Sequence, residues 1–209
     1  MSYKDKKKSV LYDSSEGYDL FAPDYDIGEK FLDSIDNNAV FGLLKGLKGK
    51  RILDVGAGTG RIIPKLKKFG IENIVAADVS GGMLKVLKKK FPNIPTVEAD
   101  IEKLPFEDES FDAVISLFVI VHLKILEKAF EEVYRVLKPG GVFILSNINQ
   151  RKPPKLLTKK GEEIVIKSFY HIPEHVISAL EGAFFKIEKN EFVYEKEVRI
   201  NQIIMAVKI

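Results

Sequence analysis

The sequence contains no cysteine, and it has only three histidines, His122, His171 and His175. Without cysteine, the chain has no disulfide bonds, no thiolate nucleophile and no cysteine–metal site. Three histidines are also few for a metal centre, so we expect no bound metal. Glutamine occurs only as Gln150 and Gln202, while lysine and glutamate are frequent. This bias suggests a heat-adapted source.

Long apolar runs and a strong charge of either sign are missing as well. No run approaches the roughly 18 residues of a membrane span, and no signal-peptide core follows Met1. We therefore expect a cytoplasmic protein without a membrane partner. The formal net charge of +3 is too small to indicate a nucleic-acid partner. With 209 residues, 45% hydrophobic and 30% charged, the chain is sufficient for one globular domain.

The most informative stretch is Ile52-Leu-Asp-Val-Gly-Ala-Gly-Thr-Gly-Arg61. The apolar run from Arg51 to Val55 predicts a strand, and the glycines at 56, 58 and 60 predict a tight turn that a ligand can approach closely. The amphipathic segment that follows, to Phe69, predicts a helix that begins near Thr59. Free N–H groups at the start of such a helix would face a carboxylate or a phosphate.

The spacing of these residues separates two kinds of nucleotide site. The dinucleotide fingerprint G-x-G-x-x-G requires a third glycine where this chain has Arg61. The chain has instead D-x-G-x-G-x-G from Asp54, which resembles motif I of the class I S-adenosylmethionine-dependent methyltransferases. A tight turn without a ligand is the alternative interpretation. The resemblance implies that the donor is contacted by Asp54, Gly56, Ala57, Gly58, Thr59, Gly60 and Arg61, with the Asp54 carboxylate available to an ammonium group.

A second carboxylate follows a second apolar segment. Residues 74–77 predict a strand that ends at Asp78, 18 residues beyond Gly60. An acid at this place in a doubly wound sheet can accept both ribose hydroxyls of an adenosyl group. The alternative is an N-terminal cap for the helix predicted at 81–91, a position that Ser80 also suits. Val79 and Met83 would border the donor, although Met83 also suits the core.

Asp100 ends a third predicted strand, at 94–99. From Ala99, the pattern A-D-I-E-x-L-P-F-x4-F-D-A-V-I-S leads into a fourth strand at 111–117, and it closely resembles the second and fourth motifs of the same family. The Asp100 carboxylate would accept from the adenine amino group, and the Ile101 N–H would reach a ring nitrogen. The resemblance implies that the side chains of Leu117 and Phe118 border the sulfonium group of the donor.

The block R-V-L-K-P-G-G-x-F-I-L, from Arg135, is another close family match. It follows a helix predicted at 123–137, with Glu131 and Arg135 paired, and precedes a strand at 142–148. The segments 184–194 and 198–208 are predicted to form the last two strands, joined as a hairpin.

The resemblance, strong over residues 50–148, is to the type 11 group with its UbiE-like small-molecule enzymes. It implies an α/β fold: a Rossmann-like, doubly wound, seven-stranded mixed sheet with the last strand antiparallel and helices on both faces. S-adenosyl-L-methionine would be the methyl donor and S-adenosyl-L-homocysteine the product.

Residues 1–48 are expected to form an N-terminal arm and helical cap, and 49–209 the donor-binding domain. Residues 1–9 are lysine-rich and expected to fray. The aromatic and acidic stretch 12–26 has no clear strand or long helix, and we interpret it either as a mobile lid or as a permanently packed arm. A helical region with a break at 36–38 follows. Tyr12 and Tyr18 are candidate donor contacts, and Tyr18 is also a candidate catalytic residue.

The acceptor site is less marked in the sequence. His122 would be a general base or the cap of the next helix. A basic, proline-interrupted loop at 151–160 and the segment before a helix near residue 175 are expected to complete the pocket. Tyr170 and His171 could equally belong to the turn that starts this helix. The candidate substrate residues are Tyr25, His122, Asn147, Arg151, Tyr170 and His171.

Several acceptors are disfavoured. No Asn-Pro-Pro-Tyr or Asp-Pro-Pro-Tyr follows the fourth strand, which disfavours amino methylation of adenine or glutamine, and cysteine-dependent methylation of pyrimidine C5 is excluded. We expect in-line transfer to a small molecule by a monomer or homodimer. The alternatives are a tRNA or protein methyltransferase, whose basic loop would meet phosphate, a non-catalytic adenosyl-binding subunit and, more remotely, a nicotinamide oxidoreductase.

Overall fold

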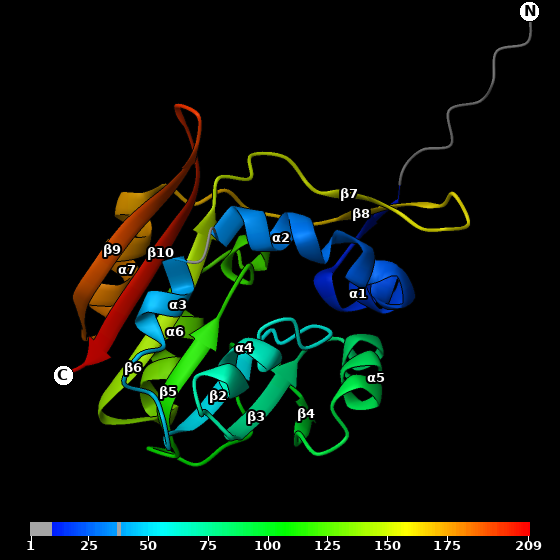
Figure 1. The fold of residues 1–209 in the computed structure, drawn as a ribbon. Helices are drawn as coiled ribbons and strands as arrows, with labels where there is room; N and C mark the ends of the chain where they lie inside the picture. Colours follow the sequence, from blue (N-terminus) through cyan, green and yellow to red (C-terminus); the bar gives the residue numbers. More distant parts are fainter. Residues whose placement is uncertain (1–9, 37–38) are drawn as a thin grey trace, which may run out of the picture.

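The computed structural model describes residues 10–36 and 39–209 (Figure 1). The segment 1–9 and part of the helix break predicted at 36–38 lie outside the described residues. A seven-stranded sheet with the order β4-β3-β2-β5-β6-β10-β9 forms the centre of the molecule. Its strands are β2 (Arg51–Val55), β3 (Asn73–Asp78), β4 (Thr96–Glu98), β5 (Phe111–Ser116), β6 (Leu137–Ile148), β9 (Phe185–Glu195) and β10 (Val198–Lys208).

Only β10 among these strands runs against its neighbours, since it pairs antiparallel with both β6 and β9. The other neighbouring pairs are parallel. The predicted doubly wound mixed sheet and its terminal hairpin are therefore confirmed. Continuous apolar runs explain the central strands: residues 52–55 of β2 are all buried, as expected for a strand covered on both faces.

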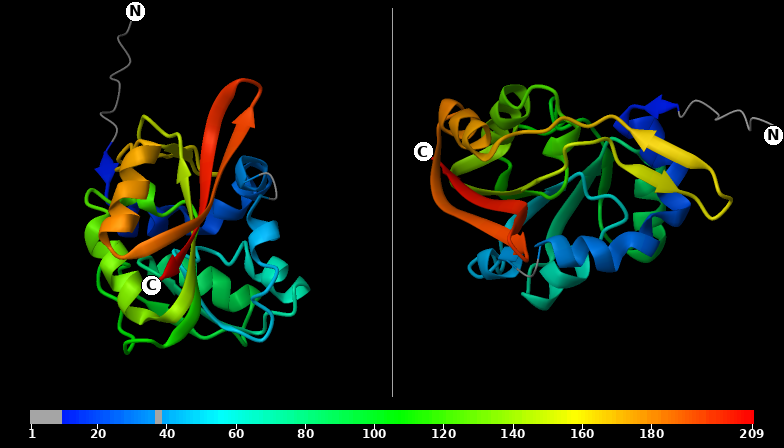
Figure 2. Two further views of the ribbon diagram at one scale, coloured as in Figure 1. Left: turned by 90° about the vertical axis from the view of Figure 1, so that its left-hand side faces the viewer. Right: turned by 90° about the horizontal axis from the view of Figure 1, so that it is seen from above.

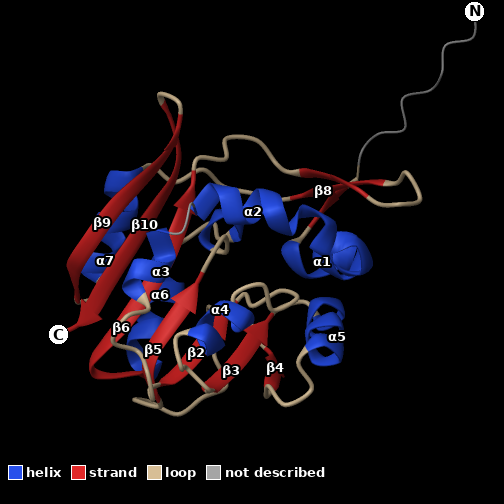
Figure 3. Ribbon diagram, in the orientation of Figure 1, coloured by secondary structure: helices blue, strands red, loops and turns tan. Residues whose placement is uncertain are grey.

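Helices cover both faces of this sheet (Figures 2 and 3). Leu53 packs in one core cluster with the helices α6 (Glu127–Val136) and α7 (Pro173–Gly182). Its neighbour Ile52 points to the opposite face and packs in a second cluster. The helices of that face are α3 (Ala39–Leu43), α4 (Ile63–Lys68) and α5 (Gly81–Lys90).

The start of α4 differs from the sequence prediction. The helix begins at Ile63, whereas residues 58–62 form turns, so the predicted start near Thr59 was wrong. Gly60 adopts a φ of +87°, which is incompatible with a right-handed helix, and Pro64 lies in the first turn. Helix α4 therefore has six residues and starts after the glycine turn.

Two other local predictions also need correction. Strand β6 begins at Leu137, which pairs with Phe111, and an irregularity follows before Val142 pairs with Ala113. Arg135 pairs with Glu132 and Asp108 and not, as predicted, with Glu131. Its guanidinium also donates to the carbonyl oxygens of residues 104 and 106, which draws the side chain toward the loop before β5.

The aromatic and acidic stretch is more regular than the sequence indicated. It contains β1 (Leu11–Tyr12), α1 (Ser14–Phe21) and the 3-10 helix η1 (Ala22–Gly28), and α2 (Glu29–Asp36) follows. Strand β1 pairs with β8 (Glu163–Ile166), which pairs with β7 (Lys155–Leu157) in a separate small sheet. The predicted basic loop is therefore partly a hairpin. Helices α1 and α2 lie above the carboxyl ends of the central strands (Figure 1).

No helix in the described ranges 10–36 and 39–209 is both long and apolar enough to cross a membrane.

Candidate functional site

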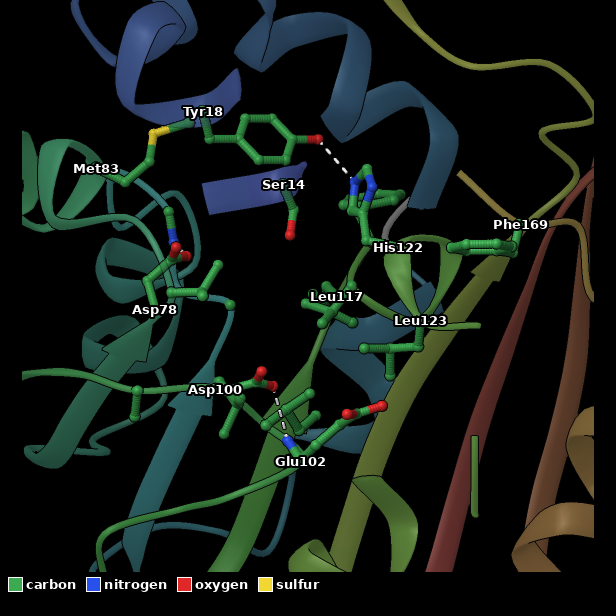
Figure 4. Close-up of a pocket in the computed structure, with 18 of the residues that line it drawn as sticks. Ser14, Tyr18, Asp78, Met83, Asp100, Glu102, Leu117, His122, Leu123 and Phe169 are labelled. Carbon is green, nitrogen blue, oxygen red and sulfur yellow. Dashed lines mark hydrogen bonds between the residues drawn. The ribbon is translucent and has the colours of Figure 1, made fainter. Parts of the chain in front are cut away.

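A cavity of about 240 Å³ lies at the carboxyl ends of β2, β3 and β5, beneath the N-terminal arm (Figure 4). We call this space the donor cavity. Its sheet side contributes backbone from the glycine turn and the carboxylates of Asp78 and Asp100. The arm contributes Tyr18 and Tyr25. The other predicted residues in its lining are Gly56, Gly58, Val79, Met83, Ile101, Leu117, Phe118 and His122.

The glycine turn brings its backbone to the cavity at Gly58. This residue has a φ of +55°, and an added Cβ would lie 3.9 Å from Tyr25 Cε1, its nearest neighbour. Its N–H donates to Asp78 Oδ2 at 2.8 Å. Gly60 differs, because a Cβ there would lie 2.9 Å from both Ile63 and Phe91. Gly60 is therefore needed for packing beneath the turn.

Asp78 is the best-placed carboxylate of the cavity. Its Oδ2 accepts from the Gly58 N–H and its Oδ1 from the Ser80 N–H at 2.9 Å. Each oxygen keeps a further acceptor position, which fits the two hydroxyls of a ribose. Burial raises the pKa of Asp78, while these N–H donors act in the opposite direction. The capping role considered for Asp78 belongs to Ser80, whose Oγ accepts from the Met83 N–H at 3.1 Å.

Asp100 lines the same cavity and lies below Asp78 in the view of Figure 4. Its Oδ1 accepts from the Glu102 N–H at 2.9 Å, which fixes the orientation of the carboxylate.

Phe118 has a positive φ of 64°, and its N–H donates to Ser146 Oγ at 2.7 Å. This bond anchors the turn that carries Leu117 and Phe118 to the cavity wall.

Six predicted donor contacts do not line the cavity in the described structure. Tyr12 is part of β1 in the small sheet, where it pairs with Ile166, and Ala57 lies in the core. Thr59 donates to Asp26 at 2.5 Å. Arg61 pairs with Asp33 at 2.5 Å and with Asp36 at 2.8 Å. The side chains of Thr59 and Arg61 thus hold the arm to the glycine turn. Gly60 and Asp54 are the remaining two predicted donor contacts that do not line the cavity.

Asp54 is buried beneath the turn, with 3% of its surface exposed. Its Oδ2 atom has no hydrogen-bond partner among the described residues. Burial raises the pKa of Asp54 to about 7, with Arg61 lowering it and Asp78 raising it further. The side chain is therefore poised between its neutral and its ionised form near neutral pH.

His122 lies in the 3-10 helix η2 (Ile120–His122), directly under the arm. Its Nε2 is 2.9 Å from the Tyr18 hydroxyl, and its Nδ1 is 2.9 Å from the Lys167 carbonyl oxygen. Because a carbonyl accepts only, Nδ1 carries the proton, and Nε2 of the neutral ring accepts from Tyr18. Helix α6 begins later, at Glu127, so His122 does not cap it.

Burial shifts both members of this pair toward their neutral forms. It lowers the pKa of His122, although the hydrogen bond to Lys167 acts in the opposite direction. It raises the pKa of Tyr18 well above 10.0, and Tyr25 and Asp78 raise it further. Near neutral pH the pair is a phenol that donates to an uncharged imidazole.

A second cavity, of about 320 Å³, lies on the other side of this pair, and we call it the apolar cavity. Tyr18, Tyr25, Phe118 and His122 line both cavities. Apolar side chains form most of the remaining wall. Gln150 is an exception: its Nε2 is buried and has no hydrogen-bond partner within the described residues. The other lining residues are Phe21, Ile27, Gly28, Phe31, Leu32, Ile35, Val121, Ile148, Pro154, Leu156 and Leu157.

Four predicted substrate residues lie apart from both cavities. Asn147 donates to the His171 carbonyl oxygen at 3.2 Å, and His171 Nε2 donates to the Leu123 carbonyl oxygen at 2.9 Å. Tyr170 accepts from Arg199 at 3.2 Å and lies under the Arg151 guanidinium. This network joins β6 to β10 and to the segment before α7.

Strand alternation explains which residues the sequence prediction missed. Successive side chains of a strand point to opposite faces, so Ile148 reaches the apolar cavity while Asn147 does not. Gln150 lies two residues beyond Ile148 and also reaches the cavity. The alternation of side chains in β6 therefore distinguishes Ile148 from Asn147, whereas Gln150 lies beyond the end of the strand. No such signal indicated Ser14 and Phe169, which enter the donor cavity from distant segments.

Comparisons with known proteins agree with this geometry. The family model described as "Methyltransferase domain" matches residues 53–145. Demethylmenaquinone methyltransferase of Chlorobaculum tepidum is 32% identical over 207 residues, which cover 93% of this chain and 81% of the relative. The ubiquinone/menaquinone biosynthesis C-methyltransferase UbiE of Bartonella tribocorum is 34% identical over 158 residues, which cover 71% of this chain and 60% of the relative.

A solved structure, the S-adenosylmethionine dependent methyltransferase from Mesorhizobium loti, matches with a TM-score of 0.72 and 20% identity. The match covers 85% of this chain and 100% of that structure's chain. At this level of identity the likeness shows a common fold.

Proposed function

Since the chain belongs to the class I S-adenosylmethionine-dependent methyltransferases, we propose that it methylates a small, largely apolar molecule held in the apolar cavity. One observation carries this proposal: Tyr18, Tyr25, Phe118 and His122 line both the donor cavity and the apolar cavity. A donor in the first cavity and an acceptor in the second would therefore meet at this shared wall.

The donor cavity fits S-adenosylmethionine by the chemistry of its side chains. Asp78 would accept from the ribose hydroxyls and Asp100 from the adenine amino group, while Leu117 and Phe118 would border the sulfonium. Bound there, the donor supplies an electrophilic methyl group. The aromatic side chains of the arm would exclude water and help to align the acceptor, two effects that contribute to the rate of in-line transfer.

The acceptor that fits the second cavity is an apolar ring compound that carries an oxygen. A buried amide donor without a partner costs about 1–3 kcal/mol, so an acceptor oxygen that meets Gln150 Nε2 would recover this energy. The two relatives are named for demethylmenaquinone and for C-methylation in quinone biosynthesis. We therefore propose a hydroquinone-like ring, methylated on carbon.

The Tyr18–His122 pair would take up the acceptor's proton. Because His122 Nδ1 donates to the Lys167 carbonyl, Nε2 keeps a free lone pair toward Tyr18. The acceptor's hydroxyl proton would pass to the Tyr18 oxygen as the Tyr18 proton moves to Nε2. This transfer makes the ring electron-rich at the moment of attack and leaves His122 protonated. After the methyl group has bonded to the ring carbon, the C–H proton of that carbon would leave to solvent, and the proton on His122 would return through Tyr18 to the ring oxygen, which restores the aromatic hydroquinone.

The test is turnover with methyl-labelled S-adenosylmethionine on separate acceptors. A hydroquinone with a short prenyl tail should gain one methyl group, with one equivalent of S-adenosylhomocysteine released. Polar catechols, amines, bulk tRNA and protein should stay unlabelled. Label confined to tRNA or protein would contradict the proposal, and tight donor binding without turnover on any acceptor would favour a non-catalytic subunit.

A variant of Gln150 tests whether this side chain binds the acceptor's oxygen. Gln150→Leu should raise KM for the hydroquinone about tenfold, the loss expected for one hydrogen bond to a buried group, and leave donor affinity unchanged. Gln202→Leu is the matched control, because Gln202 belongs to the Asn147 network outside the cavities. The expected cytoplasmic location and the monomeric or homodimeric state stay predictions.

A further inference from the structure

The mouth of the apolar cavity is rimmed by exposed apolar side chains. Ile27, Phe31 and Leu157 all line this cavity, yet 65%, 68% and 66% of their surfaces are exposed. They come from η1, α2 and β7, three elements that are separate in the sequence. Clustered exposed apolar groups of this kind mark an interaction site more often than scattered ones do.

A basic segment borders this rim. Residues 151–160 carry five basic side chains, Arg151, Lys152, Lys155, Lys159 and Lys160, and the acidic Glu162 and Glu163 follow. All five are exposed. Two of them are paired, Lys155 with Glu163 at 3.2 Å and Lys159 with Asp24 at 3.5 Å. Strand β7, which follows Lys152, and α2 lie at the same end of the molecule, beyond the carboxyl ends of the central strands (Figures 1 and 2).

We propose that this end of the protein, with Ile27, Phe31 and Leu157 beside the basic segment 151–160, docks on the surface of an anionic lipid bilayer. Apolar groups inserted at the headgroup level, combined with lysines that face anionic lipid, are the two contributions that hold a protein at such an interface. The surface carries both at one place, around the opening of a cavity.

The charge of the surface favours lipid over a second copy of the chain. Two copies in face-to-face contact would bring their basic segments together, which is unfavourable within a Debye length of about 8 Å at physiological ionic strength. An anionic bilayer offers opposite charge and an apolar layer below it. The sequence analysis expected no membrane partner because the chain has no apolar run long enough to span a bilayer. Docking on the bilayer surface needs no such run, so the proposal departs from that expectation.

The inference rests on the proposed function in one respect, since an apolar acceptor would enter the cavity from the bilayer through this rim. The test does not depend on turnover. The full chain is sedimented with vesicles of phosphatidylcholine alone, and with vesicles that contain about one third phosphatidylglycerol, in the absence of donor and acceptor. Turnover on a water-soluble, short-tailed hydroquinone is measured separately.

We expect binding to the anionic vesicles that weakens with added salt. Phe31→Ser combined with Leu157→Ser should reduce binding at least tenfold, and Lys152→Glu combined with Lys160→Glu should do the same, because each lysine near an anionic surface is worth roughly fivefold. Ile209→Ser is the apolar control, since Ile209 is 73% exposed at the chain terminus, away from α2 (Figure 1). Lys50→Glu, next to the amino end of β2, is the charge control.

Equal binding of the rim variants and the controls would overturn the proposal, as would no binding of the wild-type chain to anionic vesicles. A concentration-dependent dimer that Phe31→Ser abolishes, without vesicle binding, would identify a second copy as the occupant and also overturn it. Vesicle binding without turnover would contradict the proposed function alone.

Discussion

The Tyr18 hydroxyl lies 2.9 Å from His122 Nε2, although the two residues are 104 positions apart in the sequence. The bond joins α1 of the arm to the segment that leaves β5, and both side chains line both cavities. The rings also meet edge to face, with centroids 5.3 Å apart. This pair therefore closes the wall at which methyl transfer is proposed to occur.

A first prediction concerns the protonation of this pair. Below the pKa of His122, which burial lowers from 6.5, the imidazolium cannot accept from Tyr18. Turnover should therefore fall as the pH decreases, with a midpoint below 6.5. The same shift affects folding: between the lowered pKa and 6.5 the unfolded chain binds more protons, so this histidine makes the protein more stable as the pH rises through that window.

Tyr18→Phe is the matching variant, because it removes only the hydroxyl. Loss of proton transfer typically costs 10²–10⁴-fold in rate, and we expect about 100-fold lower kcat with donor affinity within about twofold of wild type. The pH profile of kcat and calorimetric donor binding provide the two readouts. Wild-type turnover by Tyr18→Phe would show that the pair has only a structural role.

A second prediction concerns Asp78, which is proposed to accept from the ribose. Asp78→Ala should weaken donor binding by about 2–4 kcal/mol, the value of two hydrogen bonds to a charged group. Asp78→Asn is the control for the turn, since its amide oxygen can still accept from the Gly58 N–H or the Ser80 N–H. An unchanged dissociation constant for Asp78→Ala in calorimetry would refute the ribose assignment.

The third prediction separates backbone strain from obstruction of the donor. Gly58→Val places a branched side chain toward the donor cavity at a φ of +55°, and we expect at least tenfold weaker donor binding. Gly140→Val carries similar strain, at a φ of +72°, with nothing within 4 Å of its added Cβ. It should lose stability but keep donor affinity. If both variants bind the donor as wild type does, the turn does not approach the ligand.

A fourth prediction is that residues 12–25 form a lid that tightens when the donor binds. The arm already folds onto the domain, because Asp19 accepts from Ser80 and from the Gly82 N–H, and Asp26 accepts from Thr59. The question is whether these bonds persist without donor. Amides of α1 should gain protection from hydrogen exchange on donor addition, while those of the central sheet stay unchanged.

Truncation before Glu29 extends this test, since it should reduce turnover and leave a folded core. Full protection of the α1 amides without donor would identify the stretch as a permanently packed arm. The domain division at residue 48 would then lose its functional meaning.

The sequence was sufficient to predict the central sheet and the two carboxylates Asp78 and Asp100. Apolar runs define the central strands, and the motif spacing places the two acids at the carboxyl ends of β3 and β4. The arm could not be predicted because α1 is a helix of eight residues that contains Gly17. A Cβ at Gly17 would lie 2.7 Å from Ile166 Cγ1, so the reason for this glycine is a packing contact with a distant strand.

The acceptor site was predicted least well, and the reason is the same. Side chains from η1, α2 and β7 form part of its wall, and no local sequence pattern indicates that these segments lie together. Arg61 shows the effect within a motif: the resemblance placed it at the donor, but two aspartates of α2 draw its guanidinium to the arm.

The central claim, that donor and acceptor occupy two cavities on either side of one wall, is tested most directly by filling the second cavity alone. Leu32 lines the apolar cavity and is not part of the donor cavity lining. A single-turnover measurement on Leu32→Trp, with methyl-labelled donor and a short-tailed hydroquinone, should show donor affinity within about twofold of wild type and at least tenfold less transfer to the ring. Transfer at the wild-type rate would contradict the account, because the acceptor would then have to bind elsewhere.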